Sequence, residues 1–268
     1  MSLKTGLDKI SKGGFFFILA ADHRESLKKM VEKNATEEKM VKVKKLLAKV
    51  LSPHSSGFLL DPIYGLEAIK NVKCGLLLCR EKTGYIGNPD DRRTILMEEW
   101  NVKKLKELGA HAIKLLVYYN PEKSSAKYQE NIVKKVSDEC YKEGIPFVCE
   151  FALYDVEKNR NKYIVNSAKR ISKLGIDVLK TEAPNNLKYC KKLSEKIKIP
   201  WIVLSGGRKY DEFKELIKIA AMGGASGFAG GRAIWQDTFK DEKLIKDVSV
   251  QRLKELSEIV RSYGSPIP

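Results

Sequence analysis

Lys180 lies near the end of an apolar run, residues 175–184, where a buried strand would pass into its loop. Moving an ammonium group out of water is costly unless the group has a partner or a shifted pKa. A lysine that is neutral for part of the time is a nucleophile for carbonyl groups. The residue type and its position therefore predict carbonyl chemistry at Lys180.

Two more residues support this prediction. Lys114 interrupts the apolar run 112–118, which predicts a strand buried on both faces, so its ammonium needs a buried anion. Glu150 ends the next such run and is the natural partner. The ammonium group of Lys114, if it lies near Lys180, is expected to lower the pKa of the Lys180 amine. Glu150 could carry protons during bond cleavage. Asp22 is a further candidate proton carrier, a partner for substrate hydroxyls, or an ion-pair partner of Arg24.

Strand alternation tests whether these groups meet. Side chains two residues apart lie on the same face of a strand. Lys180 then shares a face with Val178, and Glu150 shares a face with Val148. By the same rule Lys114 lies on the same strand face as Ala112, and Asp22 lies on the same face as Ala20. We therefore expect all four ionisable side chains to point into one interior.

Two glycine-rich segments have the composition of a phosphate site. Their residues are Ser205, Gly206 and Gly207 in one segment, and Gly230, Gly231 and Arg232 in the other. Such segments offer backbone amides, a hydroxyl group and a guanidinium group to an anion. Residues 233–237 are predicted to begin a short helix whose N-terminus faces that anion.

Apolar runs alternate with helical patterns along the chain. The expected strands are 15–20, 57–60, 75–79, 112–117, 146–149, 177–179, 201–204 and 226–229, and the expected helices are 36–51, 92–108, 125–143, 164–174, 187–197, 211–222 and 241–262. This order predicts an α/β fold, the (β/α)8 TIM barrel, as a single domain over residues 1–268. An open doubly wound sheet is the alternative, but no GxGxxG pattern follows the first strand. Residues 62–72 leave room for only a short helix.

Active sites of such barrels lie at the carboxyl ends of the strands. His23 and Arg24 follow the first strand and Asp61 follows the second, so we predict that all three contact substrate. The chain has three histidines, and His54 and His111 precede their strands, which argues against a histidine-rich metal site. We expect no metal and no cofactor, although Asp22, Asp61 and Glu81 could bind Mg²⁺.

The net charge of +16 raises the question of nucleic-acid binding. Most lysines fall at polar positions of the predicted helices, however, so a solvated surface is the expected interpretation for Lys39, Lys42, Lys44, Lys45, Lys49, Lys103, Lys104, Lys106, Lys191, Lys192, Lys196 and Lys198. We expect no nucleic-acid partner, and the positive field would attract phosphorylated small molecules. The chain has no long apolar segment or signal peptide, and its five cysteines lack CxxC spacing, so we expect a cytoplasmic protein with reduced thiols and no membrane partner.

Several segments together resemble one family, the class I tagatose-1,6-bisphosphate aldolases and the related sulfofructose-1-phosphate aldolases. The segments are 19–25 (LAADHRE), 59–66 (LLDPIYGL), 81–85 (EKTGY), 113–119 (IKLLVYY), 177–182 (DVLKTE) and 230–233 (GGRA). The resemblance implies that Lys180 forms a Schiff base with a phosphorylated ketose, that Glu150 and Lys114 assist, and that Ser205 and Arg232 bind the C1 phosphate.

The resemblance leaves several points open. His23 stands where the family usually carries glutamine, which is expected to alter contacts to the distal half of the substrate. The distal anion is a phosphate or a sulfonate, and a transaldolase on the same scaffold or a non-enzymatic sugar-phosphate sensor are alternatives to a lyase. Barrels of this kind often pair, so we expect a homo-oligomer.

Overall fold

The computed structural model describes residues 6–32, 35–86 and 91–267, without the side chains of residues 83–86. Parallel strands close into a barrel in the order β1-β2-β3-β6-β7-β8-β9-β10. Their bounds are Phe16–Ala20 (β1), Gly57–Leu60 (β2), Gly75–Cys79 (β3), Ala112–Tyr118 (β6), Phe147–Ala152 (β7), Val178–Thr181 (β8), Trp201–Leu204 (β9) and Gly227–Gly230 (β10). The TIM-barrel prediction is confirmed, and the predicted strands differ from the observed ones by a few residues at their ends.

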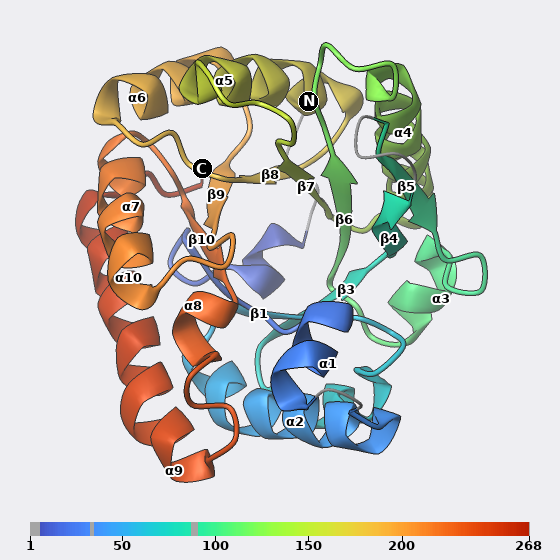
Figure 1. Cartoon of the computed structure of the whole chain (residues 1–268), viewed down its shortest axis with the longest axis vertical. Coiled ribbons are helices and arrows are strands. Elements are labelled where there is room, and N and C mark those ends of the chain that lie inside the picture. Colours follow the sequence, from blue (N-terminus) through green and yellow to red (C-terminus); the bar gives the residue numbers. More distant parts are fainter. Residues whose placement is uncertain (1–5, 33–34, 87–90, 268) are drawn as a thin grey trace.

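Helices surround the strands on the outside of the barrel (Figure 1). Their bounds are Glu25–Val31 (α1), Glu37–Leu51 (α2), Val102–Glu107 (α3), Ala126–Glu143 (α4), Arg160–Ile171 (α5), Leu187–Lys196 (α6), Tyr210–Met222 (α7), Arg232–Trp235 (α8), Glu242–Leu244 (α9) and Val250–Tyr263 (α10). Short 3₁₀ turns cover Leu7–Ile10 (η1), Ser52–His54 (η2), Leu66–Asn71 (η3) and Ser172–Leu174 (η4), and a π turn covers Ile245–Ser249 (η5). The turn η3 is the short helix expected in 62–72. None of the described helices is long and apolar enough to span a membrane.

The interior of the barrel is filled by alternate residues of the strands. One apolar cluster includes Ile18 and Ala20 of β1, Ala112 of β6, Val148 of β7 and Val178 of β8. These residues share strand faces with Asp22, Lys114, Glu150 and Lys180, as predicted. A larger cluster packs the other strand faces against the helices. The four ionisable groups therefore stand above an apolar plug.

The turn η1 closes the amino-terminal mouth of the barrel. Ile10 belongs to the interior cluster, and its carbonyl accepts a hydrogen bond from Ser56 Oγ at 2.8 Å. A Cβ atom on Gly75 would lie 2.0 Å from the carbonyl oxygen of Lys9, so only glycine permits this approach. With this mouth closed, a substrate can reach the interior from the carboxyl ends of the strands.

The prediction of a helix at 92–108 is wrong for the first half of this range. Residues Arg93–Leu96 form β5, which pairs antiparallel with β4 (Glu81–Ile86), and only Val102–Glu107 is helical. Thr94 donates from its hydroxyl to Leu116 O at 3.0 Å, and its amide donates to Gln129 Oε1 at 3.2 Å. These partners lie on β6 and α4, so tertiary contacts outweigh the helical spacing of the apolar residues.

Candidate active site

Four predicted residues meet at the carboxyl-terminal mouth of the barrel. Lys114 Nζ lies 2.8 Å from Asp22 Oδ2, 2.7 Å from Glu81 Oε1 and 3.0 Å from Glu150 Oε2. Lys180 Nζ lies 2.9 Å from the same oxygen of Glu150. The side chains of Lys114 and Lys180 are only 2% and 5% exposed. Two buried ammonium groups therefore share one carboxylate oxygen.

The strand register produces this meeting. Glu150 of β7 pairs with Lys180 of β8, and on its other side it pairs with Leu116 of β6. Lys114 lies one inward-facing position earlier on β6, so its side chain rises from below toward Glu150. Neighbouring parallel strands therefore deliver the three groups to one level of the barrel.

Burial and mutual charge shift the pKa values of this cluster. Burial alone would lower the pKa of Lys114, but Asp22, Glu150 and Glu81 raise it well above its ordinary value. Burial alone would raise the pKa of Asp22 and of Glu150, but the neighbouring lysines Lys114 and Lys180 outweigh burial and lower both. The directions of these shifts favour a charged Lys114 ammonium and charged Asp22 and Glu150 carboxylates at neutral pH.

Glu81 is a member of the cluster that the sequence did not predict as a catalytic group. It begins β4, directly beyond the end of β3, and its Oε2 accepts the Leu116 amide at 3.1 Å. Burial, together with the charge of Asp22, raises the pKa of Glu81 more than Lys114 and Arg24 lower it. The signal in the sequence is its position after the third expected strand and within the segment 81–85 of the family resemblance.

Arg24 supports Glu81 from outside the cluster. Its Nη2 donates to the Glu81 carbonyl at 2.9 Å, and its Nη1 lies 3.9 Å from Met97 Sδ. The guanidinium group therefore ties the segment after β1 to the hairpin that carries Glu81. The predicted contact between Arg24 and substrate stays a prediction.

Asp61 and Lys44 form a fully buried ion pair behind the predicted catalytic residues. Both side chains have 0% exposure, and Lys44 Nζ lies 2.5 Å from Asp61 Oδ2. The expectation of a solvated Lys44 is therefore wrong, because its ammonium also donates to the carbonyls of Ala21 and His23 at 2.5 and 2.9 Å. Asp61 Oδ1 accepts the amides of residues 63 and 64. In this structure Asp61 holds the segments after β1 and β2.

The three carboxylates considered for Mg²⁺ each contact a lysine instead. Asp22 and Glu81 contact Lys114, and Asp61 contacts Lys44. Within residues 6–32, 35–86 and 91–267, no cluster of three or more His, Cys, Asp or Glu side chains is arranged to hold a metal ion.

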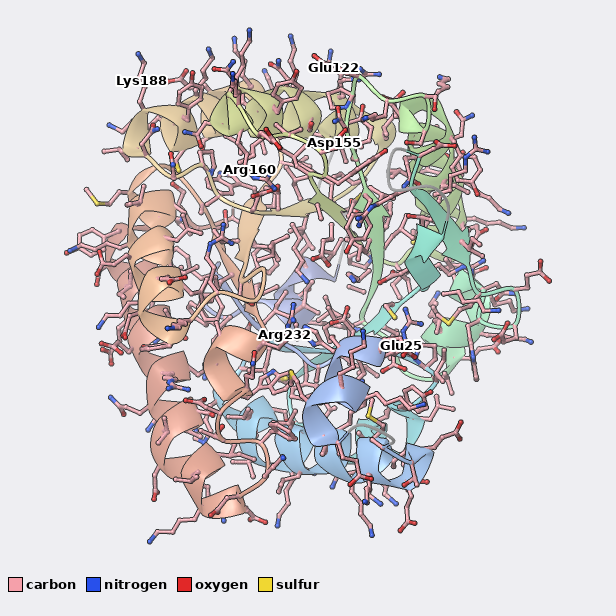
Figure 2. The ribbon with its side chains drawn as sticks, viewed as in Figure 1. Glu25, Glu122, Asp155, Arg160, Lys188 and Arg232 are labelled. Carbon is pink, nitrogen blue, oxygen red and sulfur yellow. The ribbon has the colours of Figure 1, made fainter. Side chains whose placement is uncertain are left out.

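The predicted phosphate segments lie together at the ends of β9 and β10. Gly206 and Gly207 have φ angles of 59° and 79°, and the Gly231 amide lies 3.4 Å from Ser205 Oγ. A Cβ atom on Gly207 would lie 3.2 Å from Arg232 Nη2, so the guanidinium group covers this turn. Arg232 lies on the inner side of the ring of helices in Figure 2. Its Nε is buried without a hydrogen-bond partner among the described residues.

Two further features complete this region. Arg208, which was not among the predicted site residues, donates to the Ser205 carbonyl at 3.4 Å and adds a second guanidinium group beside Gly206. A side chain on Gly230 would collide with Ile234, since its Cβ would lie 2.5 Å from Ile234 Cδ1. Gly230 therefore lets α8 pack against the strand end, and α8 starts at Arg232, one residue before the expected short helix.

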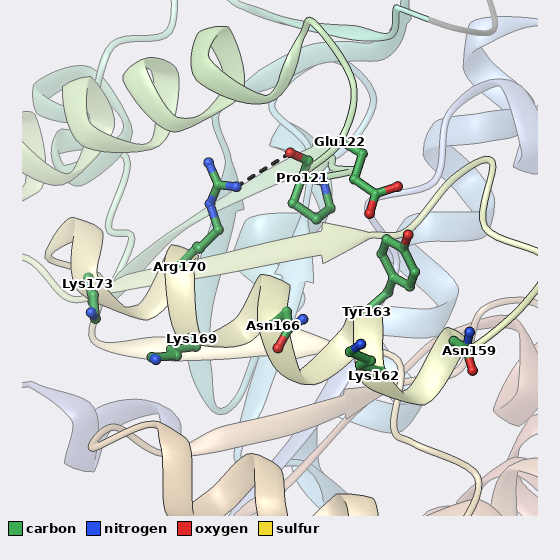
Figure 3. Close-up of a pocket in the computed structure, with 9 residues that line it drawn as sticks. All are labelled: Pro121, Glu122, Asn159, Lys162, Tyr163, Asn166, Lys169, Arg170 and Lys173. Carbon is green, nitrogen blue, oxygen red and sulfur yellow. Dashed lines mark hydrogen bonds between the residues drawn. The ribbon is translucent and has the colours of Figure 1, made fainter.

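A separate groove of about 620 Å³ lies on the outer face of α5, away from these residues (Figure 3). Lys162, Lys169 and Lys173 line it along the helix, and Arg170 donates to the Pro121 carbonyl across it. None of the predicted catalytic residues lines this groove. The chemistry suggested by the sequence is therefore confined to the barrel mouth.

The closed barrel with two buried lysines beside a glutamate is the architecture of a lysine-dependent aldolase. A model of the DeoC/LacD family aldolases matches residues 16–237, and the chain belongs to this family. A tagatose 1,6-diphosphate aldolase of Staphylococcus aureus strain RF122 is 35% identical over 263 residues, covering 83% of this chain and 81% of its own. The enzyme of strain JH9 is 36% identical over 266 residues, with the same coverage.

Solved structures share the fold. An archaeal fructose 1,6-bisphosphate aldolase has a TM-score of 0.75 and 18% identity, covering 97% of this chain and 100% of its own. A second archaeal structure, described with its catalytic lysine bound covalently to the carbinolamine intermediate, has a TM-score of 0.73 and 18% identity, covering 98% and 100%. The expected relation to sulfofructose-1-phosphate aldolases stays a prediction.

Proposed function

We propose that this protein is a class I aldolase that cleaves a ketohexose 1,6-bisphosphate, such as tagatose 1,6-bisphosphate, into dihydroxyacetone phosphate and glyceraldehyde 3-phosphate. The observation that carries the proposal is the contact of Lys180 Nζ with Glu150 at 2.9 Å, deep in the barrel mouth. The named activity of the Staphylococcus relatives and their coverage of the chain support it.

Lys180 attacks the C2 carbonyl of the ketose as a neutral amine. The proton that its ammonium gives up passes to Glu150 across 2.9 Å. The carbinolamine that forms loses water with a proton returned by Glu150, and the product is a protonated imine. Lys114 contacts the same oxygen of Glu150 and keeps this carboxylate between the two lysines.

The protonated imine then accepts the electrons of the C3–C4 bond. The C4 hydroxyl gives its proton to the Glu150 carboxylate, the bond breaks, and the aldehyde leaves while an enamine remains on Lys180. Glu150 returns a proton to C3, and water releases dihydroxyacetone phosphate. Asp22 Oδ2 lies 2.8 Å from Lys114 Nζ. Its carboxylate is the second group that could accept a hydrogen bond or the proton from the C4 hydroxyl.

The C1 phosphate fits the segments after β9 and β10. The Gly231 amide contacts Ser205 Oγ, and the Arg232 guanidinium group covers the turn at Gly207, so these anion-binding groups lie next to one another at this end of the barrel. Barrel enzymes commonly bind phosphate after their last two strands.

Borohydride trapping tests the proposal. Incubation with dihydroxyacetone phosphate and borohydride should add the reduced three-carbon unit to the peptide that carries Lys180, as mapped by mass spectrometry. Lys180→Met should give no adduct, and Lys169→Met on the outer groove should label as the wild type does. An adduct on another lysine, or none, would remove the assignment.

Turnover of a substrate panel separates the related functions. We expect tagatose bisphosphate or fructose bisphosphate to be cleaved faster than sulfofructose 1-phosphate, and the opposite order would assign the sulfosugar reaction. Cleavage that requires an added acceptor aldehyde would indicate a transaldolase. Binding of ketose phosphates without turnover would indicate a sensor.

A further inference from the structure

His23 lies between a carboxylate and the predicted phosphate segments. Its Nδ1 is 3.9 Å from Asp22 Oδ1. The Cε1–Nε2 edge of the ring faces Gly231, because a Cβ atom on that glycine would lie 2.7 Å from His23 Cε1 and 3.3 Å from Nε2. The rings of His23 and Trp235 pack in a T-shaped arrangement, with centroids 5.4 Å apart and an interplanar angle of 81°. The imidazole is therefore fixed with one nitrogen toward each side.

The side that faces Gly231 is the side of the phosphate segments. The Gly231 amide lies 3.4 Å from Ser205 Oγ, and Arg232 follows directly in the chain. His23 Nδ1 is buried and has no hydrogen-bond partner among the described residues. A buried nitrogen without a partner is unusual in a folded protein. Because Nδ1 lies on the Asp22 side of the ring, a proton on this nitrogen would give it the carboxylate as its partner.

We propose that binding of a phosphate monoester dianion at Ser205 and Arg232 draws one proton from solvent onto His23, so that the imidazolium bridges the phosphate and Asp22. This inference rests on the phosphate position given under the proposed function. It makes His23 a residue that determines how phosphate binding depends on pH.

A neutral imidazole has two tautomers, and neither can donate on both sides. If Nδ1 holds the proton, it can donate toward Asp22, but the lone pair of Nε2 then faces the bound phosphate. If Nε2 holds the proton, it can donate to the phosphate, but the lone pair of Nδ1 then faces Asp22. Only the imidazolium ion donates at both nitrogens. Two anions on opposite edges of one ring therefore favour protonation.

The charges around the unliganded ring act in the opposite direction. Burial is the main cause that lowers the pKa of His23. The charges of Arg232 (α8), Lys44 (α2) and Lys180 (β8) lower it further, whereas the charge of Asp22 raises it. The resulting pKa of His23 is about 4. A dianion beside Arg232 offsets these cations. Because an opposite charge in contact typically moves a pKa by about 1 to 3 pH units, the ring in the complex is expected to titrate at about pH 5 to 7. Proton uptake on binding is then expected between the pKa of the unliganded ring, about 4, and that value.

Calorimetry with glycerol 3-phosphate tests the proposal without the aldolase reaction, since this ligand has no carbonyl group and cannot form an imine. Binding enthalpies at about pH 5.5, between the pKa of the unliganded ring and the pKa expected in the complex, in two buffers of different ionisation enthalpy give the number of protons taken up. The wild type should take up more protons than His23→Gln, by a fraction of one proton, and Asp22→Asn should reduce the difference. His54→Gln serves as a matched control and should behave as the wild type.

Nuclear magnetic resonance gives an independent measure, because the chain has only three histidines to assign. The His23 ring protons should titrate at least about one pH unit higher with saturating glycerol 3-phosphate than without it. Folding of each variant is checked in the same spectra. Equal proton uptake by the wild type and His23→Gln, or an unshifted titration, overturns the proposal.

The two proposals fail separately. Borohydride labelling of Lys180 together with equal proton uptake would leave the aldolase assignment in place and remove the role of His23. Absence of glycerol 3-phosphate binding would also overturn the proposed role of His23. Proton uptake lost in His23→Gln, with no labelling of Lys180, would support the role of His23 and remove the aldolase.

Discussion

Glu150 connects the two lysines at the barrel mouth, because its Oε2 lies 2.9 Å from Lys180 Nζ and 3.0 Å from Lys114 Nζ. A neutral lysine can form only if the proton has somewhere to go, and this oxygen is its immediate neighbour. Burial would lower the pKa of Lys114, but its three carboxylate neighbours raise it. Lys114 therefore keeps its proton and cannot act as the neutral amine. The division of roles between the two lysines follows from their different numbers of anionic partners.

Glu150→Gln preserves the shape of the side chain and removes its charge and its proton affinity. We expect kcat to fall by about 10² to 10⁴, the usual contribution of a positioned acid or base. Steady-state cleavage of tagatose bisphosphate measures the effect. Glu67→Gln, which disrupts only the exposed pair of Glu67 with Lys45, is the matched control and should retain wild-type kcat. A Glu150→Gln enzyme with unchanged kcat would contradict the proton-transfer role.

At the scale of elements, the segment after β1 is held from two sides. Lys44 of α2 binds the carbonyls of Ala21 and His23, and Trp235 of α8 donates to the Ala20 carbonyl at 3.0 Å. Asp22 lies within this clamped segment. An outer helix on each side therefore fixes the height at which the first strand presents its carboxylate to Lys114.

Lys44→Met should lower the free energy of unfolding by about 3 to 5 kcal/mol, because it leaves the carboxylate of Asp61 buried without its cation. Urea denaturation measures this change. Lys45→Met, one residue along the same helix and in an exposed ion pair, should change stability by less than about 1 kcal/mol. Adding Asp61→Asn to Lys44→Met should recover stability, because the amide keeps an acceptor for residues 63 and 64. No recovery would show that the cost comes from lost packing instead.

The β4–β5 hairpin shows where element prediction from sequence reached its limit. Residues 92–108 carry apolar side chains at helical spacing, yet Arg93–Leu96 pairs with the strand that starts at Glu81. The start of α3 was marked locally, since Asn101 Oδ1 accepts the Lys104 amide as a helix cap. Strand β5, which precedes α3, has no such local signal, because the hydrogen-bond partners of Thr94 lie on β6 and α4.

For the whole molecule, the shifted pKa values predict how stability depends on pH. The pKa of His23 is about 4 in the folded, unliganded protein against an ordinary value of 6.5. Below pH 6.5 the unfolded chain therefore binds a proton that the folded chain does not, so stability falls as the pH falls toward 4. Asp22 and Glu150 have lowered pKa values and add a further loss below their ordinary values of 3.8 and 4.5.

Urea denaturation between about pH 7 and 4.5 checks this prediction, because the range spans the ordinary pKa of histidine. The wild type should lose on the order of 2 to 3 kcal/mol more than His23→Gln, since a difference of one in pKa between the folded and unfolded states corresponds to about 1.4 kcal/mol. Saturating glycerol 3-phosphate should reduce the difference if the ring becomes protonated on binding. Parallel pH profiles for the two proteins would show that His23 titrates at its ordinary value in the folded state.

The barrel could be predicted from local patterns, because its eight strands are buried on both faces and appear as short apolar runs between helical segments. The inward direction of Asp22, Lys114, Glu150 and Lys180 could be predicted as well, since strand alternation is a local property. Three contacts could not be predicted in this way: Glu81 with Lys114, Lys44 with Asp61, and His23 with Gly231. Each of these contacts joins segments far apart in the chain, and their side chains meet only once the ring of strands has closed.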